Sequence, residues 1–137
     1  MRLLIAVVAL LMVGCSSGGY VDMQPVNPKG WSEPVSIFYE NGDMESLRDI
    51  SVALRYNSSF QDDTLSVVLH TSLPDARQFR ERITLQLKRE YSSAAVTSSE
   101  SVPYRDDCQL SQSGIYIFTI TPSRAVTGVE AVGIEIR

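Results

Sequence analysis

The chain has 137 residues and a formal net charge of −4 at pH 7, from 12 basic and 16 acidic side chains. That balance argues against nucleic acid, or the anionic surface of a membrane, as the main partner, because both require a basic footprint. The length suits one domain with a modest core and is too short for two comfortable ones.

The chain begins with a secretory signal pattern. Arg2 supplies one positive charge, and residues 3–13 form an unbroken apolar run of about eleven residues. A helix needs roughly twenty apolar residues to cross the hydrocarbon core of a bilayer, so this run is too short for a stable span. It has the length of the hydrophobic region of a signal peptide. No other stretch of the sequence is apolar enough to span a bilayer.

The type of signal is indicated by residues 11–15, Leu-Met-Val-Gly-Cys, which look like the processing site of a bacterial lipoprotein. The Cys15 thiol can take a diacylglyceryl group as a thioether, and Gly14 leaves room for the peptidase at the bond before it. An ordinary signal peptide that contains a Cys, or a buried apolar helix, is the alternative. The Ser- and Gly-rich stretch after Cys15 favours the lipid anchor. We therefore predict a signal peptide over residues 1–14 and lipidation of Cys15.

Lipidation of Cys15 would fix how the protein is held. A diacylglyceryl group and an N-acyl chain make three chains, and each buried methylene contributes about 0.8 kcal/mol, so release from the bilayer would be negligible. The expected partner is therefore the lipid bilayer, through acylated Cys15. Ser16 stands in place of the Asp usually associated with inner-membrane retention, and the only acid nearby, Asp22, comes late. These features predict an outer-membrane protein whose domain faces the periplasm.

The segment after the anchor differs in composition from the rest. Residues 15–30 are rich in Ser, Gly, Pro and Asn, and Pro25 and Pro28 prevent a helix. We predict a lipidated flexible tether over residues 15–30 and a single domain over residues 31–137. If Cys15 is a thioether, Cys108 has no intrachain disulfide partner. We expect Cys108 to be a small buried apolar residue rather than a reactive or bridging thiol.

From Trp31 onward the hydrophobic pattern changes to period two, which is typical of strands with one face in the core and one in water. Turn-forming residues separate the strands. Residues 102–110 are a candidate seventh strand, and residues 91–101 a mobile hairpin or loop. The six segments with the strand pattern are residues 35–39, 50–56, 65–69, 83–87, 115–121 and 129–136.

About six to eight strands without a convincing amphipathic helix predict an all-β domain, an antiparallel β-sandwich or a jelly-roll-like fold. Two large aromatic residues, Trp31 and Phe118, are expected in its core or along the edge of that core rather than in a ligand site.

Residues typical of catalytic or metal sites are sparse. The only histidine, His70, falls on the polar phase of its strand, which favours an exposed residue over a metal ligand or general base. The pairs Asp62-Asp63 and Asp106-Asp107 would suit calcium, but neither has the ligand spacing of an EF-hand, and solvated turns fit better. The sequence contains no P-loop, nucleophile elbow or zinc-binding cluster. We predict no enzymatic activity, no metal and no cofactor.

A local basic group comprises Arg77, Arg80, Arg82, Lys88 and Arg89. Strand alternation would put Arg80, Arg82 and Lys88 on one face. We expect them to keep that face soluble rather than to bind a defined anion.

Several short motifs follow one another in a distinctive order. Trp31 precedes a strand with Phe38, and Leu54-Arg55 is followed five residues on by Phe60. The chain ends with GIYIF at residues 114–118, then Arg124, then GVEAVGI at residues 128–134. In this order and spacing, residues 31–137 resemble the GldH-type gliding-motility lipoproteins of Bacteroidetes. The resemblance implies a non-enzymatic component of an envelope machine that serves gliding or protein secretion.

Two classes of function remain open. The first is a structural or interaction module that binds other envelope proteins through a sheet face or an exposed edge. The second is a lipoprotein that binds a small ligand or glycan with Trp31, Tyr56, Phe60 and Tyr104, if these cluster on the surface. The scattered charged and aromatic residues favour the first class. A hydrolase has the least support, because no nucleophile–base pair is present.

Overall fold

The computed structural model describes residues 19–89 and 97–137. The predicted signal peptide, Cys15 and most of the predicted loop at residues 91–101 lie outside the described residues. Among those described, no helix is long and apolar enough to cross a membrane. The eight strands are β1 (Tyr20–Pro25), β2 (Val35–Asn41), β3 (Leu47–Asn57), β4 (Thr64–Ser72), β5 (Gln78–Gln86), β6 (Thr97–Gln109), β7 (Gly114–Pro122) and β8 (Val129–Ile136).

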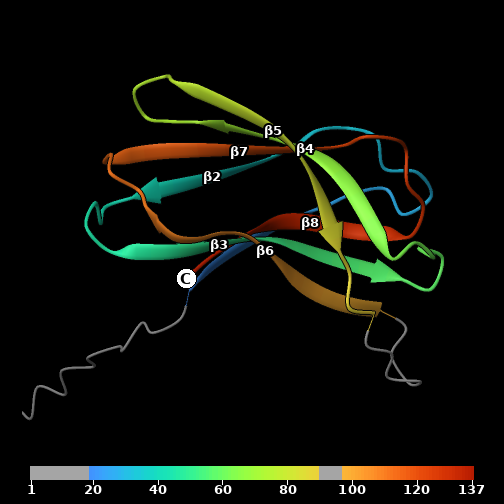
Figure 1. Ribbon diagram of the computed structural model, residues 1–137. Helices are drawn as coiled ribbons and strands as arrows, with labels where there is room; N and C mark the ends of the chain where they lie inside the picture. The colour runs from blue at the N-terminus through green and yellow to red at the C-terminus, as the bar shows by residue number, and fades with distance from the viewer. Residues whose placement is uncertain (1–18, 90–96) are drawn as a thin grey trace, which may run out of the picture.

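The strands form two four-stranded antiparallel sheets, with the orders β1-β8-β3-β6 and β2-β7-β4-β5. The two sheets pack face to face as a β-sandwich (Figure 1). The first strand pairs with the last, the second with the seventh, the third with the sixth and the fourth with the fifth. The chain is therefore one long antiparallel ribbon folded over on itself, as in a jelly roll. The predicted fold class is confirmed.

The core lies between the sheets and follows the predicted alternation. In β3, Ile50, Val52, Leu54 and Tyr56 point inward, and all four are buried. Phe118 at the centre of β7 is also buried, as is Trp31, which forms an isolated bridge with Val126. The predicted core positions of Trp31 and Phe118 are confirmed. The candidate seventh strand at residues 102–110 is confirmed as part of β6.

The predicted tether is wrong over residues 20–25, which form β1 and pair with β8 from Tyr20↔Ile136 to Pro25↔Ala131. Gly133 allows this pairing, because a Cβ at this position would lie 1.9 Å from the Asp22 carbonyl oxygen. The Gly- and Pro-rich composition of this segment does not indicate a strand. β1 is nevertheless compatible with it, because β1 is short and lies at the edge of its sheet, where a terminal proline is tolerated. The folded domain therefore includes residues 20–25, ahead of the predicted start at residue 31.

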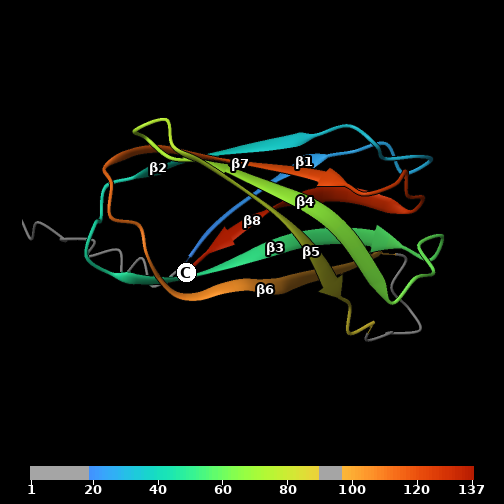
Figure 2. The same ribbon diagram turned by 45° about the horizontal axis from the view of Figure 1, so that its top comes forward.

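The two sides of the sandwich differ. On one side, β1 and β2 are joined: the Tyr20 hydroxyl donates to the Phe38 carbonyl oxygen at 2.9 Å, and the rings of Tyr20 and Tyr39 lie 4.9 Å apart. On the other side lie β5 and β6, the remaining edge strands of the two sheets. β5 pairs with β4 over its whole length, whereas β4 pairs with β7 only from Val67 to Ser72. Figure 2 shows β4 and β5 running together away from β7 and towards β6. The gap between β5 and β6 therefore narrows along the chain direction of β5.

Replacing Phe118 by Ala should lower the free energy of unfolding by about 3–5 kcal/mol, because a large buried aromatic ring is lost from the core. Phe38 is the matched control, since its ring is 59% exposed. Phe38→Ala should change the stability by less than about 0.5 kcal/mol. Urea unfolding of the two purified variants measures both values. Equal stability of the two variants would contradict the assignment of Phe118 to the core.

Candidate functional site

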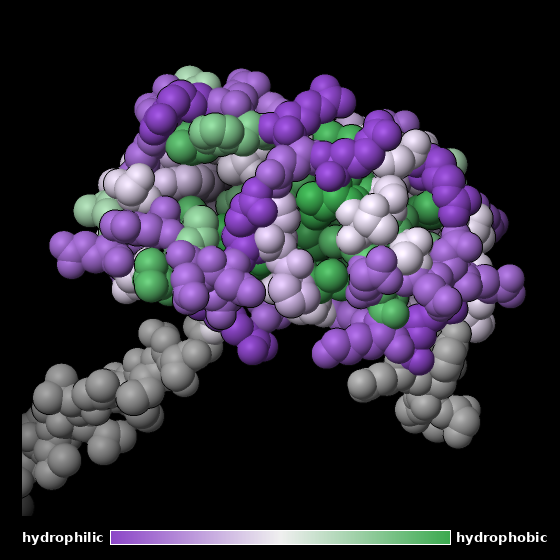
Figure 3. Space-filling model, in the orientation of Figure 1, coloured by the Kyte–Doolittle hydropathy of each residue, from purple (hydrophilic) through white to green (hydrophobic). Residues whose placement is uncertain are grey.

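A cavity with a volume of about 500 Å³ opens between β5 and β6. This volume falls within the range of small-molecule sites, roughly 300–1,000 Å³. Figure 3 shows recessed hydrophobic surface between hydrophilic side chains, in the view where β5 and β6 lie towards the reader. We call this cavity the β5–β6 cleft. Its lining residues are Ile50, Thr71, Leu73, Phe79, Arg80, Glu81, Tyr104, Arg105, Cys108, Gln109, Leu110, Ser111, Tyr116 and Phe118.

The cleft exists because β5 is covered at one end only. Its inward positions are Phe79, Glu81, Ile83 and Leu85: the first is exposed, the next two are half-buried and the last is buried. Leu85 is buried, whereas Phe79 has the same inward phase and is 55% exposed. The described strands of the opposite sheet leave Phe79 largely uncovered, so the sandwich is open there.

Two bulges in β6 shape the facing wall. Ile50 pairs with Arg105 and the next residue of β3, Ser51, pairs with Pro103, so β6 has an extra residue, Tyr104. A second extra residue lies between Arg105 and Cys108. A bulge changes the direction of side chains on the bulged strand. As a result, consecutive residues of β6, Tyr104 and Arg105, both reach across the gap to β5.

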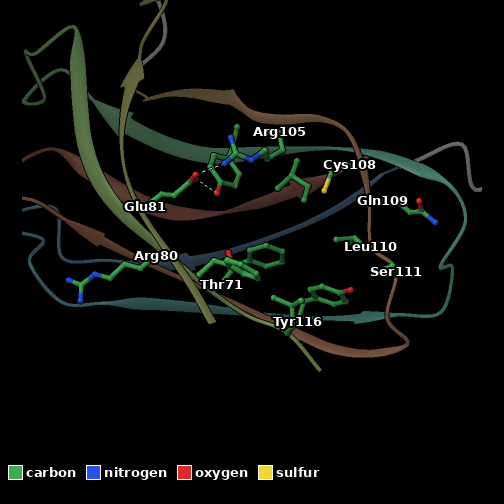
Figure 4. A pocket seen from close by; sticks show the side chains of 14 residues that line it. Thr71, Arg80, Glu81, Arg105, Cys108, Gln109, Leu110, Ser111 and Tyr116 are labelled. Atoms are coloured by element: carbon green, nitrogen blue, oxygen red, sulfur yellow. Dashed lines mark hydrogen bonds and ion pairs between the residues drawn. The ribbon is translucent and has the colours of Figure 1, made fainter. Parts of the chain in front are cut away.

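Glu81 of β5 receives both of these side chains. The Tyr104 hydroxyl donates to one carboxylate oxygen of Glu81, and the Arg105 guanidinium donates to the other. Arg105 also lies over the Tyr104 ring, with 4.6 Å between the guanidinium carbon and the ring centroid. Figure 4 shows Glu81 and Arg105 meeting across the cleft, while Arg80 points away from the other labelled residues. We call Glu81, Tyr104 and Arg105 the clamp.

The clamp changes the acidity of its members. The Tyr104 hydrogen bond and the Arg105 charge lower the pKa of Glu81. Burial, followed by the bond to Glu81, raises the pKa of Tyr104 to about 12. Ionised Glu81 therefore stabilises the fold above its ordinary pKa of 4.5, and this stabilisation is lost as the pH falls through the lowered value. Neutral Tyr104 stabilises the fold below pH 10, and this contribution is lost as the pH rises towards about 12.

Cys108 lines the cleft beyond the clamp and is a free cysteine. It is half-buried and packs against the core instead of lying fully inside it. The prediction of a buried apolar residue is therefore only partly correct. The thiol is a natural reporter for the state of the cleft, because reagents in solution can approach it.

The other polar candidates do not converge. His70 lies outside the core and bonds to Gln78 at 2.9 Å. Asp62 pairs with Arg124, and Asp107 adopts a positive φ of 50° in the bulged part of β6. Within residues 19–89 and 97–137, no cluster of three or more His, Cys, Asp or Glu side chains could hold a metal ion.

The basic group is dispersed. Arg77 pairs with Asp75 at 2.8 Å, and Arg89 lies over the rings of Tyr56 and Phe60 at 5.8 and 5.6 Å. Arg80 and Arg82 project from alternate, outward positions of β5. These contacts show separate local roles for Arg77 and Arg89, so the five residues do not form one basic surface.

The aromatic cluster considered for a ligand surface does not form. Trp31, Tyr56 and Phe60 are all buried in the core, and only Tyr104 lines the cleft. The reason is that Tyr56 and Phe60 pack edge to face, 5.7 Å apart, inside the sandwich. Phe79 and Glu81 lie before the predicted strand at residues 83–87 and belong to β5, which begins at Gln78. The alternation of the predicted strand, extended backwards, gives their inward phase. Their exposure depends on which strands of the opposite sheet lie over them.

Replacing Glu81 by Gln should lower the pKa of Tyr104 from about 12 towards its ordinary value of about 10. Gln keeps a hydrogen-bond acceptor but has no charge to oppose ionisation of the phenol. The ultraviolet absorbance of tyrosinate measures this, and Tyr104→Phe identifies which step of the titration belongs to Tyr104. Only part of the shift should disappear, because burial remains. An unchanged Tyr104 titration would show that Glu81 does not act on this hydroxyl.

Comparison with protein families and curated proteins gave no match. Among solved structures, the crystal structure of the Yersinia pseudotuberculosis-derived mitogen is similar over 87% of this chain and 84% of the mitogen chain. The sequence identity is 9% and the TM-score is 0.37. A TM-score this low carries no argument about the function of this chain.

Proposed function

We propose that this chain is a lipid-anchored, non-enzymatic binding module of the bacterial envelope. The observation that carries the binding role is the β5–β6 cleft, a cavity of about 500 Å³ with an apolar floor and an open mouth. The proposed anchor is the acylated Cys15, in the Leu-Met-Val-Gly-Cys motif at residues 11–15. An outer-membrane location with the domain in the periplasm is part of the proposal.

The short distance between anchor and domain supports a site that works near the membrane. Cys15 stands four residues before Gly19, whose backbone lies against Arg137 at the end of β8. Four residues span at most about 14 Å even when fully extended. The Tyr20↔Ile136 pair continues across the sheet to Ile50 and Arg105, which both line the cleft. The cleft therefore lies towards the end of the domain at which the anchor would hold it.

The edges of the cleft favour a ligand over an added strand from a partner protein. Edge strands are protected from further pairing by proline, bulges and inward charges. On β6, Pro103 cannot donate a hydrogen bond, and the strand has two bulges. On β5, Glu81 points inward. These features support the small-ligand class of function at this site.

A partner envelope protein is the second candidate, as the resemblance to GldH-type lipoproteins implies. The observation in its favour is a group of exposed apolar side chains, Met44, Leu47 and Ile115, on or beside two adjacent turns. Buried Asn41 holds these turns together, because its side-chain nitrogen donates to the carbonyl oxygens of Leu110 and Gln112, both at 2.9 Å. This surface could contact another protein independently of the cleft.

Replacing Cys15 by Ser should leave the protein unprocessed, soluble or in the wrong compartment, because the thioether cannot form. Fractionation of cells followed by mass measurement of the protein checks this. Cys108→Ser is the matched control and should remain lipidated in the membrane fraction. Processed Cys15→Ser protein in the membrane fraction would refute the lipid anchor.

Protease added to intact cells should leave the protein whole, whereas protease added after permeabilisation of the outer membrane should digest it. The expected protection follows from a domain that hangs into the periplasm from the inner leaflet. A known periplasmic protein and a known surface protein serve as controls in the same cells. Digestion in intact cells would place the domain on the surface and favour capture of external ligands.

A further inference from the structure

We propose that the β5–β6 cleft binds the aliphatic acyl chain of an amphiphile taken from the adjacent membrane or from solution. This inference rests on the proposed lipid anchor and deepens it by naming the class of ligand. Free fatty acids and membrane phospholipids share this chemistry.

The floor of the cleft suits a hydrocarbon chain. Ile50, Leu110 and Phe118 form buried apolar surface there, and the exposed ring of Phe79 extends this surface to the mouth. Burying apolar area contributes roughly 25 cal/mol per Å². An acyl chain in the cleft would cover the apolar lining that is now open to water, which belongs to the exposed Phe79 and the half-buried Leu73 and Cys108.

The charges of the cleft do not oppose a hydrocarbon. Glu81 and Arg105 neutralise each other in the clamp. Arg80 also lines the cavity, and its side chain points away from the other labelled residues (Figure 4). A bound acyl chain would therefore not remove an unpaired charge from water. Removing unpaired charges from water is the main cost of burying charged groups. The lining has polar atoms enough to orient a head group, but no cationic site that demands a specific anion.

The shape of the cleft predicts how the bound acyl chain is oriented. The clamp bridges β5 and β6 where the gap narrows, whereas Phe79 and the exposed residues Gln109 and Ser111 lie towards the wide end. The methyl end of the chain would point towards the clamp. The polar head would stay at the wide end, where the Ser111 hydroxyl can form hydrogen bonds to it. The side-chain nitrogen of the neighbouring Gln109 already donates to the Met44 carbonyl oxygen at 2.8 Å.

The test uses the full lipidated protein in phosphatidylethanolamine vesicles. In one arm, a photoactivatable analogue of palmitic acid is added from solution, and in the other the photoactivatable group is on the acyl chain of the vesicle phospholipid. After illumination, mass spectrometry locates the adducts. We expect adducts on residues 104–118, which supply most of the wall and floor. We also expect the bound probe to protect Cys108 from maleimide.

Matched variants make the result specific. Phe79→Asp should reduce the adducts about ten-fold or more, because it puts a charge in the apolar mouth. Phe38→Asp places the same charge at an equally exposed phenylalanine on the outer face of β2 and should change nothing. Cys108→Trp, which fills the cleft from the opposite wall, should also abolish the adducts. Circular dichroism confirms that each variant is folded.

The outcomes separate the two proposals. Adducts in the cleft from the free fatty acid, the phospholipid or both support the inference, and the productive arm identifies the source. Adducts that are absent, lie elsewhere, or decrease equally in the Phe79 and Phe38 variants overturn it. A maleimide count on the denatured protein tests the anchor separately: one reactive thiol indicates that Cys15 is acylated, and two refute the lipid anchor whatever the cleft binds.

Discussion

The architecture depends on two strand pairings, β3 with β8 and β4 with β7. The other pairings join each strand of the first half of the chain to its counterpart in the second half, which by itself gives only a long two-stranded ribbon. The β3–β8 and β4–β7 pairings fold this ribbon into two sheets and set which strands become edges. They leave β1 and β2 at one side and β5 and β6 at the other. The unpaired edge strands are protected from further pairing differently on the two sides.

The side with β1 and β2 is closed by the hydroxyl and the ring of Tyr20. On the side with β5 and β6, the clamp joins the two strands, and the backbone amides of Lys88 and Arg89, directly after β5, donate to Glu100 of β6. A cavity with partly apolar lining remains beside the clamp. A sandwich of this size has little stability to lose, typically about 5–15 kcal/mol. Retaining an open, partly apolar edge is therefore a cost that a binding role would explain. Bulges in β6 protect the open edge from other strands and also aim Tyr104 and Arg105 at Glu81.

The proposed anchor and the proposed ligand site fit together physically. Because Gly19 lies against Arg137, only four residues of chain lead from Cys15 to a part of the sandwich, far fewer than in a fifteen-residue tether. A link of at most about 14 Å keeps the domain beside its leaflet and limits its search for distant partners. A hydrocarbon ligand is abundant at that position, whereas a soluble ligand would gain nothing from it. The second surface, with Met44, Leu47 and Ile115, leaves room for a protein partner in the same assembly.

The all-β class, most of the strands and the inward phase of residues such as Val52, Leu69 and Phe118 could be predicted from the sequence. These depend on local period-two patterns, which are visible in any one strand. The assignment of Tyr20–Pro25 to a strand required the tertiary structure, because an edge strand with Pro and Gly neighbours is recognised by its pairing partner. The burial of Phe60 and the exposure of Phe79, which has the same inward phase as the buried Leu85, also depend on tertiary contacts. The candidate site also could not be predicted from local sequence patterns. The clamp joins Glu81 to Tyr104 and Arg105 because β5 and β6 are edge strands and β6 is bulged. Edge positions and bulges arise from contacts between distant parts of the chain and leave no local pattern in the sequence.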